Sequence, residues 1–367
     1  MSDSKTSLHD VLEMAVGAGA SDIHIKENCN AAVRVNGAMM YSDFLASTEV
    51  IENFINQVAS QKQKEFLEAN GDLDLSHRES GIGRFRVNIH RQRTNTAITL
   101  RYVKNEIRNF AQLGLPPVLQ KICEESRGII ILTGTTGSGK STTLAAMLEY
   151  INETRADHII TIEDPIEYEF ADVKSYFEQR EVGIDTVSFD SALTHALRQD
   201  PDVIMVGEMR DRVSFEAALK AADTGHLVLT TLHASNATQT INRILDFFEK
   251  NEQDPIRESL ANNLCAVISQ RLCIRADGKG RSPICEVMIN TPMVNKLLQE
   301  NRLDKLASAV SAGRGDGMMT FNQCLYDLVE NGTITEEDAI KASDNPEQLK
   351  MNFEGIFLSA GDNQIIG

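Results

Sequence analysis

The sequence lacks the features that would place a chain in a membrane or outside the cell. No apolar run approaches the roughly 20 residues that span a bilayer. The first ten residues, MSDSKTSLHD, are polar and contain no apolar h-region, so we expect no secretory signal peptide. Any membrane association is therefore expected to come through a partner.

Paired cysteines are also lacking. The six cysteines are scattered, at positions 29, 123, 265, 273, 285 and 324, and form no Cys-x-x-Cys pair. A structural zinc site is not expected from this spacing. The plain interpretation is a cytoplasmic protein with reduced, buried thiols.

Positive charge is in deficit. Lys and Arg total 36 against 53 Asp and Glu, which gives a formal net charge of −17. This balance disfavours a surface wrapped around nucleic acid, although it is compatible with a local basic channel. At 367 residues and 42% hydrophobic composition, the chain suits two domains, each with its own core.

The most informative motif present is a phosphate-binding loop. A strand of four consecutive apolar residues, 129–132, runs into Gly134-x-x-x-x-Gly139-Lys140-Ser141. The glycines let successive backbone N–H groups point at phosphates, Lys140 adds a positive charge, and the Ser141 hydroxyl can ligate Mg²⁺. The helix expected after the loop directs its positive N-terminus at the same anion. We therefore predict that the chain binds a nucleoside triphosphate through Gly134, Thr135, Thr136, Gly137, Ser138, Gly139, Lys140, Ser141 and Thr142.

The first hundred residues are predicted to form a small α+β domain of their own. Apolar periodicity predicts a helix over 6–18, and Thr48 is a plausible N-cap for a second helical stretch. Alternation predicts strands at 21–26, 31–35, 73–77, 84–92 and 97–103, and Asn36-Gly37 predicts a tight hairpin into AMMY. The order α-β-β-α-α-β-β-β suggests an antiparallel sheet. We predict domains at 1–107 and 119–367, joined by a semi-rigid linker at 108–118 that contains Pro116 and Pro117.

Polar residues end or border the apolar strands after the loop. Glu163 and Glu208 follow two such strands, and a third has His226 at its start and His233 at its end. Because ligands bind beyond the carboxyl ends of parallel strands, we expect Glu163, Glu208 and His233 to converge on the edge that holds Lys140. A carboxylate there can deprotonate the attacking water or hold Mg²⁺ through its waters. Each carboxylate alone is more often a helix cap than a catalyst, and a lone histidine is usually structural, but together these positions favour a catalytic edge.

These segments resemble the four signature boxes of the secretion ATPases. Residues 134–141 match the Walker A box, TIEDPIEYEF (161–170) the Asp box, DPDVIMVGEMRD (200–211) the atypical Walker B box, and AADTGHLVLTTLHASNA (221–237) the His box. Within this group the chain is most similar to the type IV pilus retraction ATPases of the PilT/PilU family. The similarity covers nearly the whole chain and includes ASDIHIK, GRFRVNIHRQR and FAQLGLP.

The resemblance implies a cytoplasmic homohexamer that hydrolyses ATP with Mg²⁺. It implies a PAS-like N-terminal domain joined to a RecA-like ATPase domain with a C-terminal helical region, and an inner-membrane pilus platform protein as partner. It also implies roles for single residues: Glu163 as the catalytic base, Glu208 as the Walker B acid near Mg²⁺, and His226 and His233 as nucleotide sensors. Arg84, Arg86 and Arg101 become candidate charge donors to nucleotide at subunit boundaries.

The chain departs from the PilT pattern at its C-terminal end. The PilT motif AIRNLIRE is missing, NTPMVNKLLQENRLDKL occupies that region, and the tail looks closer to PilU. Thr320-x-x-Gln323 and Thr335-x-x-Asp338 resemble N-cap signals for two short helices. PilU-type proteins are regarded as accessory to a PilT partner, so ATP hydrolysis is better supported here than autonomous retraction.

Three other functions stay open. A pilus assembly or type II secretion ATPase is disfavoured, because those proteins usually carry an extra N-terminal domain and often a tetracysteine insertion that we do not expect here. A nucleotide-gated scaffold with little turnover is disfavoured by Glu163, and a DNA-translocating relative by the acidic balance.

Overall fold

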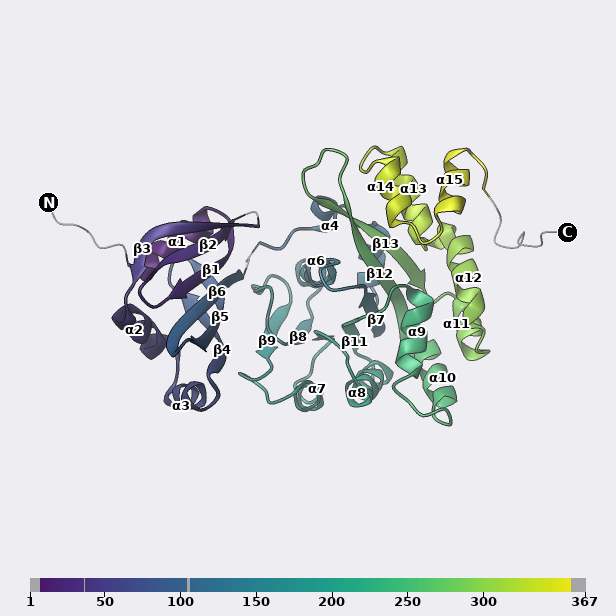
Figure 1. Ribbon diagram of the computed structural model, residues 1–367. Helices are drawn as coiled ribbons and strands as arrows, with labels where there is room; N and C mark the ends of the chain where they lie inside the picture. The colour runs from purple at the N-terminus through teal and green to yellow at the C-terminus, as the bar shows by residue number, and fades with distance from the viewer. Residues whose placement is uncertain (1–6, 36, 104–105, 358–367) are drawn as a thin grey trace. The chain divides into compact units, whose positions relative to one another are not determined.

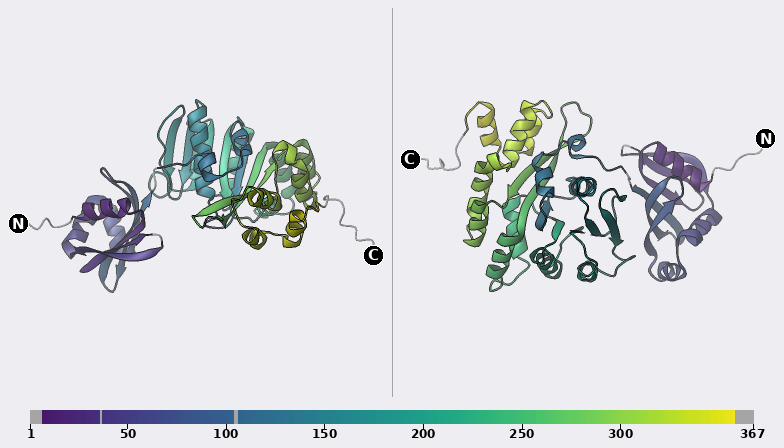
Figure 2. Two further views of the ribbon diagram at one scale, coloured as in Figure 1. Left: turned by 90° about the horizontal axis from the view of Figure 1, so that it is seen from above. Right: turned by 180° about the vertical axis from the view of Figure 1, so that it is seen from behind.

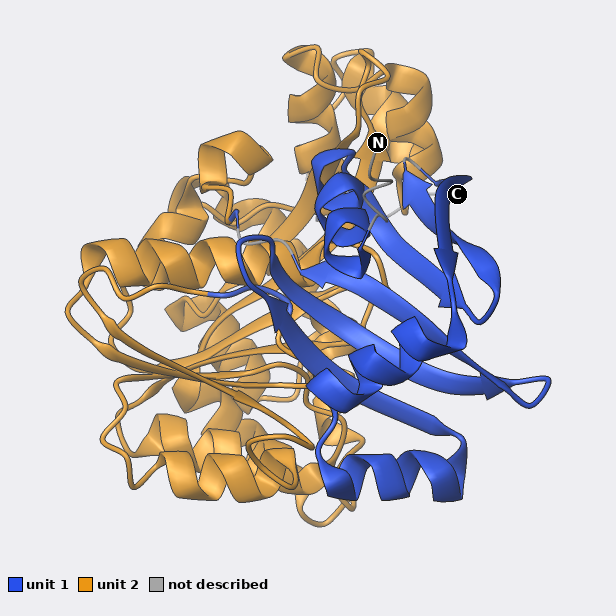
Figure 3. Ribbon diagram, turned by 90° about the vertical axis from the view of Figure 1, so that its left-hand side faces the viewer, with its two compact units in different colours: residues 1–106, 167–169 blue, residues 107–166, 170–367 orange. Residues whose placement is uncertain are grey.

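The structure, a computed structural model, describes residues 7–35, 37–103 and 106–357. The chain divides into two compact units, which Figure 3 shows in different colours. Unit 1 comprises residues 1–106 and 167–169, and unit 2 comprises residues 107–166 and 170–367.

Unit 1 is a six-stranded antiparallel sheet with helices on one face. Its strand order is β3-β2-β1-β6-β5-β4. The strands are β1 (Ala20–Lys26), β2 (Cys29–Val35), β3 (Ala38–Ala46), β4 (Asp72–Glu79), β5 (Gly83–Gln92) and β6 (Asn95–Val103), and the helices are α1 (Leu8–Gly17), α2 (Thr48–Val58) and α3 (Gln61–Asn70). The core joins one face of the sheet to apolar residues of all three helices.

Strand β5 shows why the sheet has one buried and one polar face. Phe85, Val87 and Ile89 are fully buried, whereas Arg84 and Arg86 between them are only half-buried. Successive side chains of a strand point to opposite faces, so the arginines lie on the face away from the core.

Two local details of unit 1 differ from the sequence-based expectation. The N-cap of α2 is Ser47, whose hydroxyl accepts from Val50 N–H, and not Thr48, which is the first helical residue. The sheet also has one more strand than the predicted order, because the segment after the hairpin turn forms a strand of its own, β3. Val35 pairs with Ala38 across that hairpin and Gly37 has φ 84°, while Asn36 lies outside the described residues.

Unit 2 is a seven-stranded sheet between two layers of helices. Its order is β13-β12-β7-β11-β10-β8-β9, and only β13 runs antiparallel to its neighbour. The strands are β7 (Gly128–Thr133), β8 (His158–Glu163), β9 (Tyr176–Glu181), β10 (Val203–Val206), β11 (Leu227–Leu232), β12 (Leu264–Ile274) and β13 (Arg281–Ile289).

Two hydrophobic clusters lie on the two faces of this sheet (Figure 1). One face is covered by α4 (Phe110–Leu113), α5 (Val118–Cys123) and α6 (Lys140–Thr154). The other is covered by α7 (Phe189–Ala196), α8 (Arg212–Asp223), α9 (Ala237–Leu245), α10 (Gln253–Asn263), α11 (Pro292–Gln299) and α12 (Leu306–Ala312), with short 3₁₀ turns at Leu303–Lys305 and Gly313–Asp316. The central strands are buried on both sides, which explains their continuous apolar runs.

The segment predicted as a linker is instead packed into unit 2. Phe110, Leu115 and Leu119 are buried in the cluster that includes α6, and Asn109 and Gln112 form a capping box for α4. The prediction missed this because Gly114, Pro116 and Pro117 suggested an irregular chain. The apolar residues between them bury enough surface to anchor it.

The C-terminal helices form a small cluster beside the β12–β13 hairpin. Figures 1 and 2 show α13 (Phe321–Glu330), α14 (Glu336–Ala342) and α15 (Pro346–Phe353) gathered there. The two predicted N-caps are confirmed, because Thr320 forms a capping box with Gln323 and Thr335 accepts from Asp338 N–H. Residues 358–367 of the unassigned tail lie outside the described residues.

Two further observations concern the chain as a whole. All six cysteines are unpaired; four are buried, while Cys29 and Cys265 are half-buried. In the described part of the chain, no helix combines the length and apolarity that crossing a membrane requires.

Candidate nucleotide-binding and catalytic site

The phosphate-binding loop lies between β7 and α6, as the motif predicts. Three of its glycines have positive φ, at 148° for Gly134, 79° for Gly137 and 91° for Gly139. Non-glycine residues rarely adopt such values, so the glycines fix the curl of the loop. Lys140 is the first residue of α6, is 9% exposed, and donates from Nζ to the carbonyl oxygens of Gly134 (2.8 Å) and Thr135 (3.2 Å).

This loop has the properties that a nucleotide phosphate requires. Helix α6 has Gly139 as its N-cap, and a glycine offers no side-chain cap to the N–H groups at the start of the helix. The buried Ser138 Oγ has no hydrogen-bond partner among the described residues. The Ser138 hydroxyl, a helix N-terminus and one lysine together suit an anion site.

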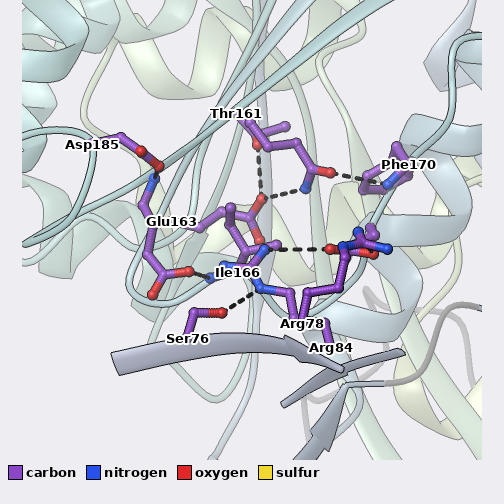
Figure 4. Close-up of polar contacts among 11 residues, drawn as sticks. Ser76, Arg78, Arg84, Thr161, Glu163, Ile166, Phe170 and Asp185 are labelled. Carbon is purple, nitrogen blue, oxygen red and sulfur yellow. Dashed lines mark hydrogen bonds and ion pairs between the residues drawn. The ribbon is translucent and has the colours of Figure 1, made fainter. Parts of the chain in front are cut away.

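Glu163 is held at the carboxyl end of β8. Its side chain is 7% exposed, and its Oε1 accepts hydrogen bonds from Thr161 Oγ1 (2.7 Å) and Gln179 Nε2 (3.2 Å), which Figure 4 shows. Thr161 precedes it by two residues on the same strand, and Gln179 comes from the neighbouring strand β9. The two donors fix the orientation of the carboxylate, as a base that must meet a water molecule in one geometry requires.

Glu208 and His233 lie next to one another. Glu208 follows β10 and His233 follows β11, and His233 Nε2 is 3.1 Å from Glu208 Oε1. Arg210 holds the other carboxylate oxygen at 2.9 Å from Nε and 2.7 Å from Nη2. Because the sheet order is β7-β11-β10-β8, the loop, His233, Glu208 and Glu163 follow successive strands at one edge. Glu163, Glu208 and His233 thus follow strands at the same end of the sheet as the loop that carries Lys140.

Gly207 occupies the position where a common Walker B segment has aspartate, and packing explains the glycine. A Cβ here would lie 3.3 Å from the carbonyl oxygen of Ile162 and 3.5 Å from Glu163 Cα. The Gly207 N–H also donates to Ile162 O (2.8 Å), and its carbonyl accepts from Thr231 Oγ1 (2.7 Å). The glycine therefore lets the end of β10 pack directly against Glu163.

His226 does not join this edge. It precedes β11, and its Nδ1 lies 2.8 Å from Ala221 O and 3.1 Å from Thr224 Oγ1, at the end of α8. Strand β11 has six residues, so His226 lies roughly 20 Å from the P-loop edge. The nucleotide-sensor role predicted for His226 is therefore not supported at the P-loop of its own chain.

The three candidate arginines share the polar face of the unit 1 sheet. Arg86 lies directly opposite Arg101 in the β5–β6 register, and Arg84 is two residues before Arg86. Arg101 donates from Nε to Asp22 Oδ1 (2.8 Å) while 62% of its side chain stays exposed, and Arg84 donates from Nε to Ser76 Oγ (2.6 Å). Strand β5 lies between β4 and β6, and β6 lies between β1 and β5, so the three arginines are on interior strands of the sheet.

The predicted Mg²⁺ site has only two protein ligands, Ser141 and Glu208. Within the described ranges, no group of three or more His, Cys, Asp or Glu side chains could hold a metal ion. Mg²⁺ does not require such a group, because it keeps several waters and is bound through substrate phosphates and one or two protein oxygens. Ser141 and Glu208 stay the predicted Mg²⁺ ligands.

Two residues of the site were not predicted from the sequence. Thr161 could have been found, since it lies two residues before Glu163 and therefore on the same face of β8. Gln179 could not, because the segment of β9, YFEQRE, has no apolar run and nothing in it indicates a neighbour of β8.

The family model described as type II/IV secretion system protein matches residues 4–350. The chain belongs to this family. It is 39% identical to the type IV pilus retraction ATPase PilT of Pseudomonas aeruginosa over 341 residues, 93% of this chain and 99% of that protein. It is also 39% identical to the type IV pilus ATPase PilU of the same organism over 343 residues, 93% of this chain and 90% of that protein.

A solved structure supports the same relationship. The crystal structure of the pilus retraction motor PilT with bound ADP superposes with a TM-score of 0.87 at 44% identity, covering 94% of this chain and 99% of that one. The mixed α/β fold with a parallel sheet is therefore that of the family. PilT and PilU are equally similar by identity, so the comparisons do not favour the PilU-like interpretation of the tail.

Proposed function

We propose that this chain is an ATP-hydrolysing motor that powers type IV pilus retraction. The observation that carries the proposal is the edge of the unit 2 sheet, where the P-loop, the Glu208–His233 pair and Glu163 follow successive strands. Relatives at 39% identity that span nearly the whole chain are named as pilus retraction and pilus ATPases.

In this proposal each residue has one role. The P-loop N–H groups and Lys140 bind the phosphates of ATP, and the buried Glu163 takes the proton of the attacking water. Thr161 and Gln179 keep its carboxylate in one orientation. Ser141, and Glu208 through water, hold Mg²⁺, which neutralises phosphate charge when bound. His233 responds to the γ-phosphate through its contact with Glu208.

The motor works as a homohexamer in this proposal, with the PAS-like unit 1 and the RecA-like unit 2 as its two domains. Arg84, Arg86 and Arg101 would then contribute positive charge to the nucleotide of a neighbouring subunit. Their common position on the polar face of one sheet supports this, since a set of cations on one face can act together. The alternative is that the three arginines form a solvated basic face with no role in catalysis.

The cellular setting is also part of the proposal. The ring acts in the cytoplasm at the inner face of the cytoplasmic membrane, through the pilus platform protein. It works alone or as a PilU-like accessory to a PilT partner.

Two measurements test the proposed function. Purified protein should release phosphate from ATP in a Mg²⁺-dependent manner, and deletion of the gene should leave pili extended and stop their retraction. ATP binding without turnover would instead support the nucleotide-gated scaffold. ATP turnover together with a deletion strain that assembles no pili would support an assembly ATPase.

A further inference from the structure

Gln270 is a buried amide that contacts the P-loop from the neighbouring strand. It lies on β12, is 2% exposed, and makes two side-chain hydrogen bonds. Its Nε2 donates to the carbonyl oxygen of Ser138 (2.9 Å), and its Oε1 accepts from Thr143 Oγ1 (2.7 Å). Ser138 belongs to the loop and Thr143 to the first turn of α6, so one side chain joins both sides of the loop-to-helix junction.

Two glycines of the loop pack directly on this residue. A Cβ at Gly139 would lie 2.7 Å from Gln270 Nε2, and a Cβ at Gly134 would lie 2.4 Å from Gln270 O. Both distances are shorter than non-bonded contacts allow. These glycines are therefore required by the packing of β12 as well as by their positive φ.

The bond to Ser138 determines the direction of one peptide group. In a planar trans peptide the carbonyl of residue 138 and the N–H of residue 139 point in opposite directions. Because Gln270 holds the Ser138 carbonyl toward β12, the Gly139 N–H points away from β12. A P-loop binds anions through N–H groups that share one side, so this constraint keeps the peptide in the anion-binding orientation.

Burial makes the constraint strong. An amide in this position that loses its partners stays buried without the hydrogen bonds that water would give it, which is costly. A loop conformation that turns the Ser138 carbonyl elsewhere would leave Gln270 Nε2 without that acceptor. The orientation of the loop and the pairing of Gln270 therefore depend on each other.

We propose that Gln270 is a positioning residue for nucleotide phosphates, which holds the P-loop in its binding conformation through Ser138 and Thr143. This inference rests on the proposed nucleotide-dependent function, but it concerns phosphate binding and not hydrolysis itself.

The test compares the same substitution at the buried Gln270 and at the half-buried Gln253, whose amide also makes two hydrogen bonds. Gln270→Met keeps the shape of the side chain and removes both hydrogen bonds. Gln253→Met is the matched control, since Gln253 Nε2 donates to Leu245 O (3.0 Å) and Phe248 O (3.3 Å) in the α9–α10 region. We measure the Kd of a fluorescent ADP, KM and kcat for ATP, and the midpoint of thermal unfolding for both variants.

We expect Gln270→Met to weaken ADP binding and raise KM roughly tenfold, since about 1.4 kcal/mol corresponds to a factor of ten. Both variants should lower the midpoint of thermal unfolding, because each loses two hydrogen bonds. Gln253→Met should leave Kd and KM unchanged. If both variants lose stability alike and neither changes Kd or KM, the proposal is overturned.

Thr143→Val keeps the test decisive if Gln270→Met fails to fold. It removes only the hydroxyl that donates to Gln270, and we expect a several-fold rise in the Kd for ADP. An unchanged Kd in Thr143→Val contradicts the proposal. If wild-type protein binds ADP but does not hydrolyse ATP, the proposed function fails, while the ADP measurements still decide the role of Gln270.

Discussion

His233 Nε2 lies 3.1 Å from Glu208 Oε1, and Arg210 holds the other oxygen of the same carboxylate. The carboxylate is thus fixed between the end of β11 and the segment after β10, on the strands between the P-loop and Glu163. In the proposed function, Mg²⁺ with its waters would compete with His233 and Arg210 for the Glu208 carboxylate. The His233–Glu208 contact would then differ between the nucleotide-free and the nucleotide-bound protein.

Lys140→Ala should abolish ATP turnover while the fold stays intact. The substitution removes the charge that faces the phosphates and very little core volume, and the ammonium donates to the loop carbonyls of Gly134 and Thr135. Phosphate release and circular dichroism, measured on the same preparation, check this. Normal hydrolysis in the variant would remove the P-loop from the mechanism.

Glu163→Gln should bind ATP normally and slow its hydrolysis about 10²–10⁴-fold, the usual contribution of a general base. The amide is nearly isosteric and can still accept from Thr161, but it cannot take up a proton. Single-turnover hydrolysis and ATP affinity separate the two steps. A variant with wild-type turnover shows that another group is the base.

Glu208→Gln should chiefly change the Mg²⁺ dependence of the reaction. The amide loses the negative charge that attracts the ion, so more Mg²⁺ should be needed for half-maximal rate. Titrating Mg²⁺ at saturating ATP measures this shift. If this variant is inactive at every Mg²⁺ concentration while Glu163→Gln is active, the two roles are reversed.

The edge of the unit 2 sheet could be predicted because its signals are local. A glycine spacing, and polar residues directly after continuous apolar strands, identify positions that a parallel sheet must bring together. The β9 strand and Gln179 could not be predicted, since β9 is a polar edge strand and its pairing with β8 is a long-range choice. Gln270 was missed for the same reason: an amide inside an apolar strand gives no sign of which loop it will contact.

The predicted linker at 108–118 and the predicted N-cap at Thr48 differ from the structure for different physical reasons. Prolines near residue 116 suggested an exposed connection, but burial of Phe110 and Leu115 outweighs that preference. At α2, Ser47 and Thr48 are both good caps, and the choice depends on which residue leaves the helical conformation. His226 was predicted from its membership of a motif, and the sheet places it at the opposite end of β11.

Glu286 should make stability depend on pH. It is 9% exposed, it accepts from Ala237 N–H at 2.7 Å, and burial raises the pKa of its carboxyl group above the ordinary value. A raised pKa in the folded state means that folding favours the protonated form. The ionised form therefore costs stability as pH rises from about 4.5 through the folded-state pKa.

Glu286→Gln should thus be more stable than wild type at pH 8, with the difference shrinking toward pH 4.5. Its amide oxygen can still accept from Ala237. Chemical unfolding at several pH values checks this, with the exposed Glu258→Gln as a control whose difference from wild type should stay flat. A wild-type advantage that grows with pH would show that the carboxylate is stabilising.

The arginine proposal predicts complementation between subunits. If Arg86 and Arg101 act on the nucleotide of a neighbour, a ring made only of Arg86→Ala or Arg101→Ala subunits should hydrolyse ATP slowly. An arginine supplied in trans can be worth roughly 10³–10⁵ in rate. Rings made only of Glu163→Gln subunits should be slow as well, because they lack the base.

Mixed rings distinguish the two arrangements. An arginine variant retains Glu163, and a Glu163→Gln subunit retains both arginines, so a trans arrangement recreates complete sites wherever the two types are adjacent in the right order. Mixing them should then raise the phosphate-release rate above the sum of the separate preparations, with a maximum near equal proportions. Lys26→Ala is the matched control, since Lys26 is an exposed cation on β1 of the same unit that is not proposed to reach nucleotide. Mixtures no faster than the sum would place Arg86 and Arg101 in cis, or outside the chemistry, and would leave the polar face of unit 1 as a solvated surface.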